Sequence, residues 1–153
     1  MQLTDLIPVD RIGCNVDANS KKRALEILGE LLSTGDSKLT SIEVFDSLIN
    51  RERLGGTGIG HGVAIPHGRV ASSDTTHGAF IKLSKAIDFD AIDNQPVDLL
   101  FALIVPEHST EEHLQVLARI AAMFNDKELR TKLRQSETSQ DLQQHILKWQ
   151  QSN

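Results

Sequence analysis

The sequence predicts a single α/β domain in which a mixed β-sheet is flanked by helices on both faces. Three observations lead to this fold class: apolar residues recur at helical spacing in several segments, short apolar runs have the length of buried strands, and turn residues separate those runs. The chain of 153 residues is long enough for one compact core. We therefore expect residues 1–153 to form one domain.

Two helices are predicted in the first third of the chain. Apolar residues recur at helical spacing from Asn19 or Ser20 onward, and Gly35 is expected to cap the C-terminal end of this helix. The second helix begins at Thr40, because Thr40 and Glu43 have the spacing of a capping box. This helix continues to residues 51–53.

Strands are predicted at residues 63–65, 78–83 and 99–105. The sequence Asp-Asn-Gln-Pro at residues 93–96 is expected to form the turn between the last two strands.

The last part of the chain is predicted to be helical. A second capping box at residues 109–112 begins a helix, and two further helices are expected near residues 127–134 and 139–149. The expected apolar face of the first of these helices consists of Leu114, Leu117, Ala121 and Phe124.

Composition excludes several classes of function. The net charge of -5 argues against nucleic-acid binding, which needs a basic surface. The longest apolar run, at residues 99–105, is far shorter than the roughly 20 residues that span a bilayer, so no direct membrane insertion is expected. Cys14 is the single cysteine and is expected to pack rather than react, which fits a cytoplasmic protein.

A glycine-rich segment at residues 55–69, GGTGIGHGVAIPHGR, holds six of the ten glycines. It lacks the Lys-Ser/Thr pair of a phosphate-binding Walker loop. It also lacks the third glycine of the dinucleotide fingerprint, because Gly58, Gly60 and Gly62 alternate. The segment therefore does not predict a nucleotide site.

The same segment presents His67 between a proline and a glycine. A neutral imidazole has a free ring nitrogen, and a phosphoryl group is a natural electrophile for it. Backbone N–H groups of Gly62 and Gly68, together with His61, are expected to support such an anion. The alternative is that His67 is a turn residue whose ring bonds to a backbone carbonyl.

Two residues outside this segment extend the phosphoryl hypothesis. Arg51 continues the apolar stripe of the second helix, where a guanidinium could reach the loop and bind phosphate oxygens. His113 lies one turn into a later helix and borders its buried face. The alternatives are a surface arginine and a satisfied histidine at the edge of the core.

A metal site formed by His61, His67 and His113 is a third reading of these residues. It lacks an H-x-x-x-H pair, a cysteine ligand and an H-E-x-x-H helix, so no metal and no other cofactor are predicted. The remaining histidines are expected at loop or helix surfaces without a role: His77, His108 and His145.

The segment RERLGGTGIGHGVAIPHGR, at residues 51–69, resembles the central motif of the mannitol/fructose-type enzyme IIA family of the bacterial phosphoenolpyruvate phosphotransferase system. The stretches FDAIDNQPVDLLFALIVPE at residues 89–107 and HLQVLARIAAMF at residues 113–124 resemble the nitrogen-type branch of that family. The similarity covers nearly the whole chain and implies a mixed sheet flanked by helices.

The resemblance implies that His67 is phosphorylated, at the tele nitrogen, that Arg51 binds the phosphoryl group, and that His113 is the second histidine of the active centre. The donor implied is an HPr-like phosphocarrier protein, charged by an enzyme I that uses phosphoenolpyruvate. Mannitol-type relatives carry glutamate where this chain has His61, and nitrogen-type relatives often carry asparagine. Histidine keeps the hydrogen-bonding capacity but not the fixed negative charge.

Transfer between proteins requires a surface on which the partner docks, and Ile59, Val63 and Ile65 are expected to form its apolar rim. The nitrogen-type similarity favours a regulator whose binding partners change with phosphorylation, with potassium transporters or sensor kinases as implied targets. The alternatives are an enzyme IIA that passes phosphate to a IIB domain for sugar transport, and a non-catalytic module that only binds an anion.

Overall fold

Strand β6 (Val97–Pro106) separates two apolar cores. In the computed structural model, which describes residues 2–109 and 111–153, its side chains alternate between them, with Phe101 in one core and Ala102 in the other. Successive side chains of a strand point to opposite faces, so this strand needs cover on both sides. The continuous apolar run that predicted a buried strand is therefore covered on both faces of the sheet.

The sheet is mixed, as predicted, and its described part has six strands in the order β1-β5-β6-β3-β2, with β4 pairing β6 beside β3. Strands β1, β3 and β4 run parallel to their neighbours β5 and β6, whereas the β5–β6 and β2–β3 pairs are antiparallel. The other strand bounds are Ile12–Val16 (β1), Gly58–Gly60 (β2), Val63–Ala64 (β3), His67–Val70 (β4) and His77–Ile87 (β5).

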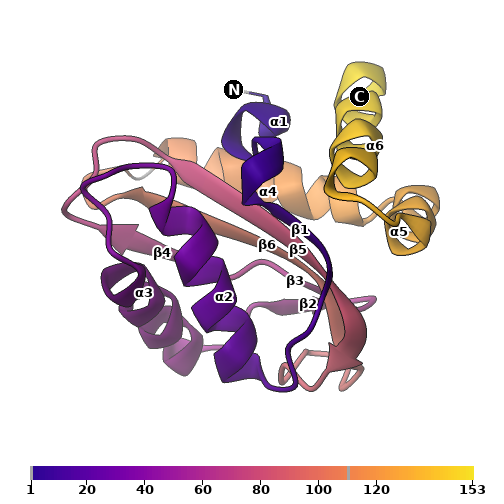
Figure 1. Cartoon of the computed structure of the whole chain (residues 1–153), viewed down its shortest axis with the longest axis horizontal. Coiled ribbons are helices and arrows are strands. Elements are labelled where there is room, and N and C mark those ends of the chain that lie inside the picture. The colour runs from indigo at the N-terminus through magenta and orange to yellow at the C-terminus, as the bar shows by residue number, and fades with distance from the viewer. Residues whose placement is uncertain (1, 110) are drawn as a thin grey trace.

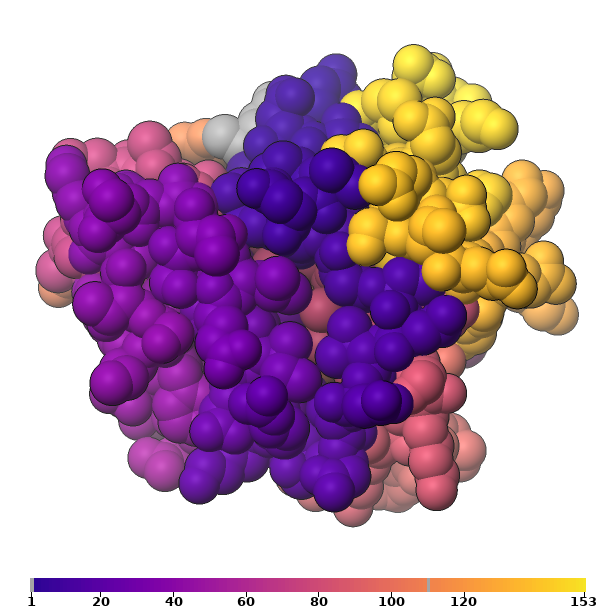
Figure 2. Space-filling view, viewed as in Figure 1, coloured from indigo at the N-terminus to yellow at the C-terminus, as the bar shows by residue number. Residues whose placement is uncertain are grey.

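Helices cover both faces of the sheet, which confirms the predicted fold class (Figure 1). Helices α2 (Lys21–Ser33) and α3 (Ser41–Leu54) pack on one face. In the space-filling view these two helices form the purple left side, and the C-terminal helices form the orange-to-yellow right side (Figure 2). The other face is covered by α1 (Leu3–Leu6), α4 (Glu111–Phe124), α5 (Lys127–Gln135) and α6 (Ser139–Ser152), and a short 3-10 helix, η1 (Val9–Arg11), leads into β1.

The helix starts follow the predicted chemistry more closely than the helix ends. The Ser20 and Thr40 hydroxyls accept the backbone N–H groups of Arg23 and Glu43, respectively. The Glu43 carboxylate does not complete the expected capping box but accepts the Ser72 hydroxyl at 2.7 Å.

Helix α2 ends at Ser33 with Thr34 as its cap residue, and Gly35 follows directly. The Gly35 N–H donates to the carbonyl oxygen of Leu32 at 3.1 Å and so satisfies one of the last carbonyls at the predicted helix end. A Cβ on Gly35 would lie 2.8 Å from both Arg11 Nη1 and His77 Nδ1, so this glycine also allows close packing.

The predicted apolar face of helix α4 is confirmed in part. Phe124 is buried, and Leu117 and Ala121 pack partly buried against the core, whereas Leu114 is 63% exposed. The rest of the buried face consists of His113, Val116, Ile120 and Met123. The expected capping box includes Thr110, which lies outside the described residues.

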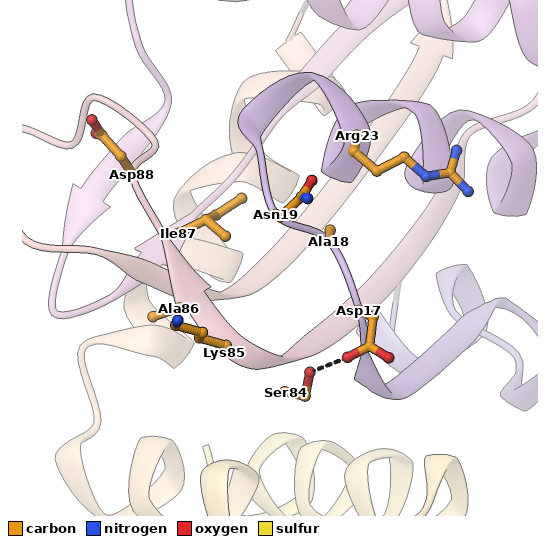
Figure 3. Close-up of a pocket in the computed structure, with 9 residues that line it drawn as sticks. All are labelled: Asp17, Ala18, Asn19, Arg23, Ser84, Lys85, Ala86, Ile87 and Asp88. Atoms are coloured by element: carbon orange, nitrogen blue, oxygen red, sulfur yellow. Dashed lines mark hydrogen bonds between the residues drawn. The ribbon is translucent and has the colours of Figure 1, made fainter.

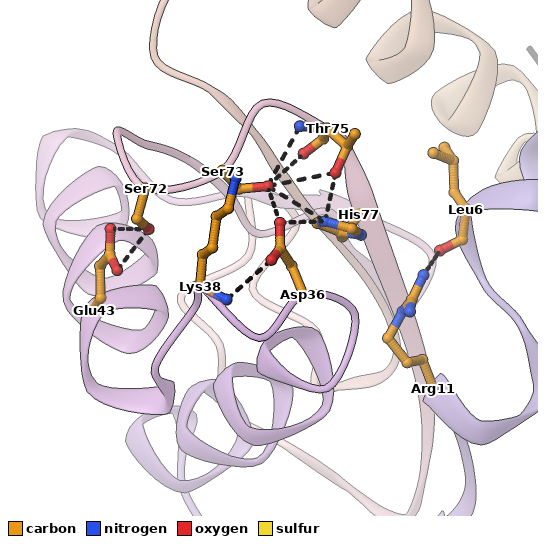
Figure 4. Close-up of polar contacts among 9 residues, drawn as sticks. All are labelled: Leu6, Arg11, Asp36, Lys38, Glu43, Ser72, Ser73, Thr75 and His77. Atoms are coloured by element: carbon orange, nitrogen blue, oxygen red, sulfur yellow. Dashed lines mark hydrogen bonds and ion pairs between the residues drawn. The ribbon is translucent and has the colours of Figure 1, made fainter.

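A polar network joins the α2–α3 connection to the start of β5 (Figure 4). The Ser73 hydroxyl donates to Asp36 at 2.8 Å, and Thr75 Oγ1 lies 2.9 Å from His77 Nε2. On the other side of His77, the buried Arg11 donates to the carbonyls of Leu6 and Gly78. His77 is thus a buried histidine, and the expectation of a surface position was wrong.

Candidate functional site

His67 is the first residue of β4, a strand whose described pairing is with β6 alone. The other side of β4 is therefore an edge where the two helical layers meet. Alternation along the strand places Val70 in the core under α3, whereas His67 lies against His113 of α4. The expected loop position of His67 was wrong, because the glycine-rich segment forms β2, β3 and β4.

Gly68 allows α3 to approach this edge closely. A Cβ at Gly68 would collide with Ser47 Oγ and lie 3.1 Å from the Ser47 carbonyl carbon. Any larger residue would push α3 away from β4. Because Arg51 follows Ser47 by one helical turn, the same contact brings its guanidinium to the strand edge.

The result is an open cavity of about 390 Å³ that contains all three residues predicted to carry the chemistry. His67 comes from β4, Arg51 from the last turn of α3, and His113 from the first turn of α4. Within the described chain, the lining consists of Ser47, Asn50, Arg51, Leu54, His67, Gly68, Arg69 and His113.

The imidazole of His67 has a defined tautomer in this arrangement. Its Nδ1 lies 2.9 Å from the carbonyl oxygen of Ile65, and since a carbonyl only accepts, Nδ1 carries the proton. Nε2 then keeps its lone pair. Burial lowers the pKa of His67 below its usual value of 6.5, and the charge of Arg51 lowers it further, which the Ile65 bond partly offsets. A neutral, nucleophilic ring is favoured at pH 7.

His113 faces His67 at a ring-centroid distance of 5.4 Å and an interplanar angle of 53°. Its side chain is buried, and its Nδ1 has no hydrogen-bond partner among residues 2–109 and 111–153. Burial lowers the pKa of His113 as well, with His67 as a further cause. An uncharged ring with spare hydrogen-bonding capacity therefore lies beside the nucleophile.

Arg51 is held at the end of its own helix, where Nη1 donates to the carbonyl oxygen of Gly55 at 2.7 Å. The adjacent Glu52 points into the protein, pairs with Lys21 at 2.9 Å and accepts hydrogen bonds from Thr57. These buried contacts hold the end of α3 against the entry to β2, so the helix that carries Arg51 is firmly placed.

Two of the predicted supporting residues, His61 and Gly62, do not line the cavity. They form the β2–β3 turn, where both have positive φ. The His61 N–H donates to Asp93 at 3.1 Å, and its carbonyl accepts from Arg134. The backbone geometry of His61 and Gly62 therefore belongs to this turn. These two residues do not form the expected anion-binding nest around His67.

The predicted docking rim also requires correction. Val63 and Ile65 are 1% and 5% exposed and belong to the core. Both pack under the layer formed by α1, α4, α5 and α6. Ile59 is partly exposed but does not line the cavity. Leu54 does line it and is 85% exposed.

Four lining residues were missed from the sequence, although patterns for them exist. Asn50 and Arg51 follow Ser47 by three and four residues, and Leu54 follows them by four and three, spacings that share one face of a helix. Arg69 follows His67 by two residues, which places both side chains on one face of a strand. The spacing of His67 and Arg69 is informative only once residues 67–70 are known to form a strand.

A larger cavity of about 660 Å³ lies elsewhere, between the segment before α2 and the end of β5 (Figure 3). Its lining carries both charge signs, including Asp17, Arg23 and Lys85, and no histidine.

Within the described residues, no group of three His, Cys, Asp or Glu side chains is placed to hold a metal ion. Among residues 2–109 and 111–153, no helix is long and apolar enough to cross a membrane.

Known proteins resemble this chain over nearly its full length. Residues 5–149 match the family described as phosphoenolpyruvate-dependent sugar phosphotransferase system, EIIA 2. The "Nitrogen regulatory protein" of Pseudomonas aeruginosa is 40% identical over 147 residues, covering 96% of each chain. The protein of that name from Escherichia coli is 43% identical over 148 residues, covering 95% of this chain and 90% of the relative.

The fold is shared with a solved structure. The crystal structure of nitrogen regulatory protein IIA-Ntr from Neisseria meningitidis superposes with a TM-score of 0.89 at 40% identity, covering 94% of this chain and 98% of that one.

Proposed function

The chain belongs to the phosphoenolpyruvate-dependent sugar phosphotransferase system EIIA 2 family, and from this premise we propose that it is a regulatory phosphohistidine carrier of the nitrogen type. His67 accepts the phosphoryl group from a phosphohistidine of an HPr-like carrier protein. The observation that carries this proposal is the bond from His67 Nδ1 to Ile65, which leaves the Nε2 lone pair available beside Arg51 and His113.

Transfer is an in-line displacement at phosphorus. The Nε2 lone pair of His67 forms the new N–P bond while the N–P bond of the donor breaks, and the electron pair leaves with the donor imidazole. Arg51 exchanges its bond to Gly55 for the phosphoryl oxygens, because a guanidinium bonds more strongly to a negatively charged oxygen than to a neutral carbonyl. His113 donates an N–H to another oxygen.

The donor docks over the open side of the cavity. Leu54 and Leu114 are exposed apolar side chains, the first lining the cavity and the second adjacent to His113 in sequence. An exposed apolar side chain beside a reactive group suits a transient protein contact. These two residues replace Val63 and Ile65 in the proposed docking surface.

Reconstitution with phosphoenolpyruvate, enzyme I and the carrier tests this function. Wild-type protein and His108→Ala, which alters an exposed histidine near α4, should gain acid-labile phosphate, whereas His67→Ala should gain none. Phosphorus NMR should place the phosphate on Nε2. Phosphate uptake by His67→Ala would contradict the proposal, and binding of inorganic phosphate without any phosphorylation would favour the anion-binding module.

The regulatory role is supported by the relatives at 40% and 43% identity, which are both named nitrogen regulatory proteins. Phosphorylated and unphosphorylated wild-type protein should therefore retain different partners in a pull-down, with potassium transporters and sensor kinases as the proposed targets. Identical partner sets would contradict the switch. Transfer of the phosphate to a IIB domain would instead support sugar transport.

A further inference from the structure

Arg69 lies in the cavity but has no role in the family resemblance or in the transfer step described above. It follows His67 by two residues in β4, so both side chains extend from the same face of the strand. Arg69, Arg51, His67 and His113 line one cavity. The two guanidinium groups come from different elements, α3 and β4.

The present contact of Arg69 is easily exchanged. Its Nη1 donates to the carbonyl oxygen of Glu107 at 3.2 Å, on the protein surface. No carboxylate of the described chain lies within ion-pairing distance of this guanidinium. A phosphoryl oxygen would be a stronger acceptor than this neutral carbonyl. Arg51 likewise donates to a neutral carbonyl oxygen, that of Gly55.

Charge balance favours a second cation at this site. A phosphoryl group carries between about 1.5 and 2 negative charges at pH 7. Arg51 supplies one positive charge, and His113 is not expected to supply another, because burial lowers its pKa below 6.5. Arg69 is the remaining cationic side chain in the lining.

We propose that Arg69 is a second arginine ligand of the phosphoryl group on His67. The proposal rests on the proposed phosphocarrier function and adds a residue to its site. Arg51 and Arg69 hold the phosphoryl oxygens from two sides of the strand edge, and Arg69 leaves the Glu107 carbonyl when the phosphoryl group arrives.

The test is the equilibrium constant for phosphoryl exchange between the carrier and this protein. Arg69→Ala should shift that equilibrium toward the carrier by roughly threefold to tenfold, since a partly exposed charge-assisted bond is lost. Arg69→Lys should show a smaller shift. The matched control is Arg53→Ala, which removes the same charge from the exposed end of α3 but does not line the cavity.

An equilibrium readout separates a phosphoryl ligand from a residue that only attracts the carrier. Altered attraction changes forward and reverse rates equally and leaves the equilibrium constant unchanged. An equilibrium for Arg69→Ala equal to that of Arg53→Ala would therefore overturn the proposal, whatever the rates. If wild-type protein itself took up no phosphate, the phosphocarrier function would fail, and the two outcomes are distinguishable.

An NMR titration of the unphosphorylated protein gives a second readout that does not depend on transfer. The charge of Arg69 contributes to lowering the pKa of both His67 and His113. Arg69→Gln should therefore raise both values, whereas Arg53→Gln should change neither. Unchanged titration of both rings in Arg69→Gln would show that its charge does not reach the cavity and would overturn the proposal.

Discussion

Two histidine environments in this protein differ in what surrounds the ring. His77 lies in a network where Thr75, Ser73 and Asp36 all approach Nε2 (Figure 4). The His67–His113 pair lies in an open cavity, with one nitrogen of His113 unpartnered among the described residues. A satisfied network stabilises a fold, whereas unused hydrogen-bonding capacity next to a nucleophile is available for a ligand.

The largest effect predicted from this contrast is on catalysis. Arg51→Ala should slow phosphoryl uptake by about 10- to 100-fold, because a charge that stabilises the transferring group is lost. Its stability should change little, since Arg51 bonds only to the end of its own helix. Rapid-quench measurement of phosphate uptake checks the rate, with Arg53→Ala as the control. Equal rates in the two variants would remove Arg51 from the site.

For the hydrogen-bond network around His77 we predict the opposite, a loss of stability without a loss of phosphate uptake. His77→Ala should lower the free energy of unfolding by about 2 kcal/mol, because Thr75, Ser73 and the buried Arg11 lose a packed partner. Phosphate uptake by the folded fraction should be unchanged. Urea denaturation measures the first quantity and reconstitution the second. A His77→Ala protein that is stable but cannot be phosphorylated would break the distinction between the two regions.

A smaller effect is expected at the docking surface. Leu54→Asn should reduce the rate of phosphoryl uptake by roughly fivefold to tenfold, since an apolar contact with the carrier is lost. The equilibrium constant should stay the same, because the substitution adds no charge and the phosphoryl ligands are untouched. Ile42→Asn places the same polar side chain on an exposed apolar position near the other end of α3 and should have no such effect. Equal rates in both variants would exclude Leu54 from docking.

The smallest effect concerns pH. Burial and the charge of Arg11 lower the pKa of His77 below 6.5, with Asp36 partly opposing them. The unfolded chain then binds a proton first as pH falls, so stability decreases below about pH 6.5. The pKa of Asp36 is itself lowered from 3.8, mainly by the Lys38 backbone N–H, so its contribution is lost only in a more acidic range.

Thermal unfolding between pH 7.5 and 5.5 measures this dependence. Because burial also lowers the pKa of His67 and His113, the wild-type protein should lose stability over this range, and His77→Gln should lose less. An identical pH dependence in the two proteins would show that folding does not lower the pKa of His77.

The fold class and the main buried strands could be predicted because their signals are local. The apolar run at residues 99–105 is long enough for a buried strand, and Ser20 and Thr40 cap helices through their own neighbours. The short strands β2 and β4 were missed, because glycine and proline in this segment are typical of loops. The pairing of β4 with β6 is a long-range contact that no local pattern reports.

By itself, the sequence determined the residue types of the site and the fold class, since periodicity and capping act within a few residues. The positions of His67, Arg51 and His113 were predicted from spacing and motif, and their roles stay predictions. Only the tertiary structure decided which side chains share the cavity. It brought in Arg69 and Leu54 and left out His61 and Val63, because the free edge of β4 and the docking of two helical layers depend on contacts between distant segments.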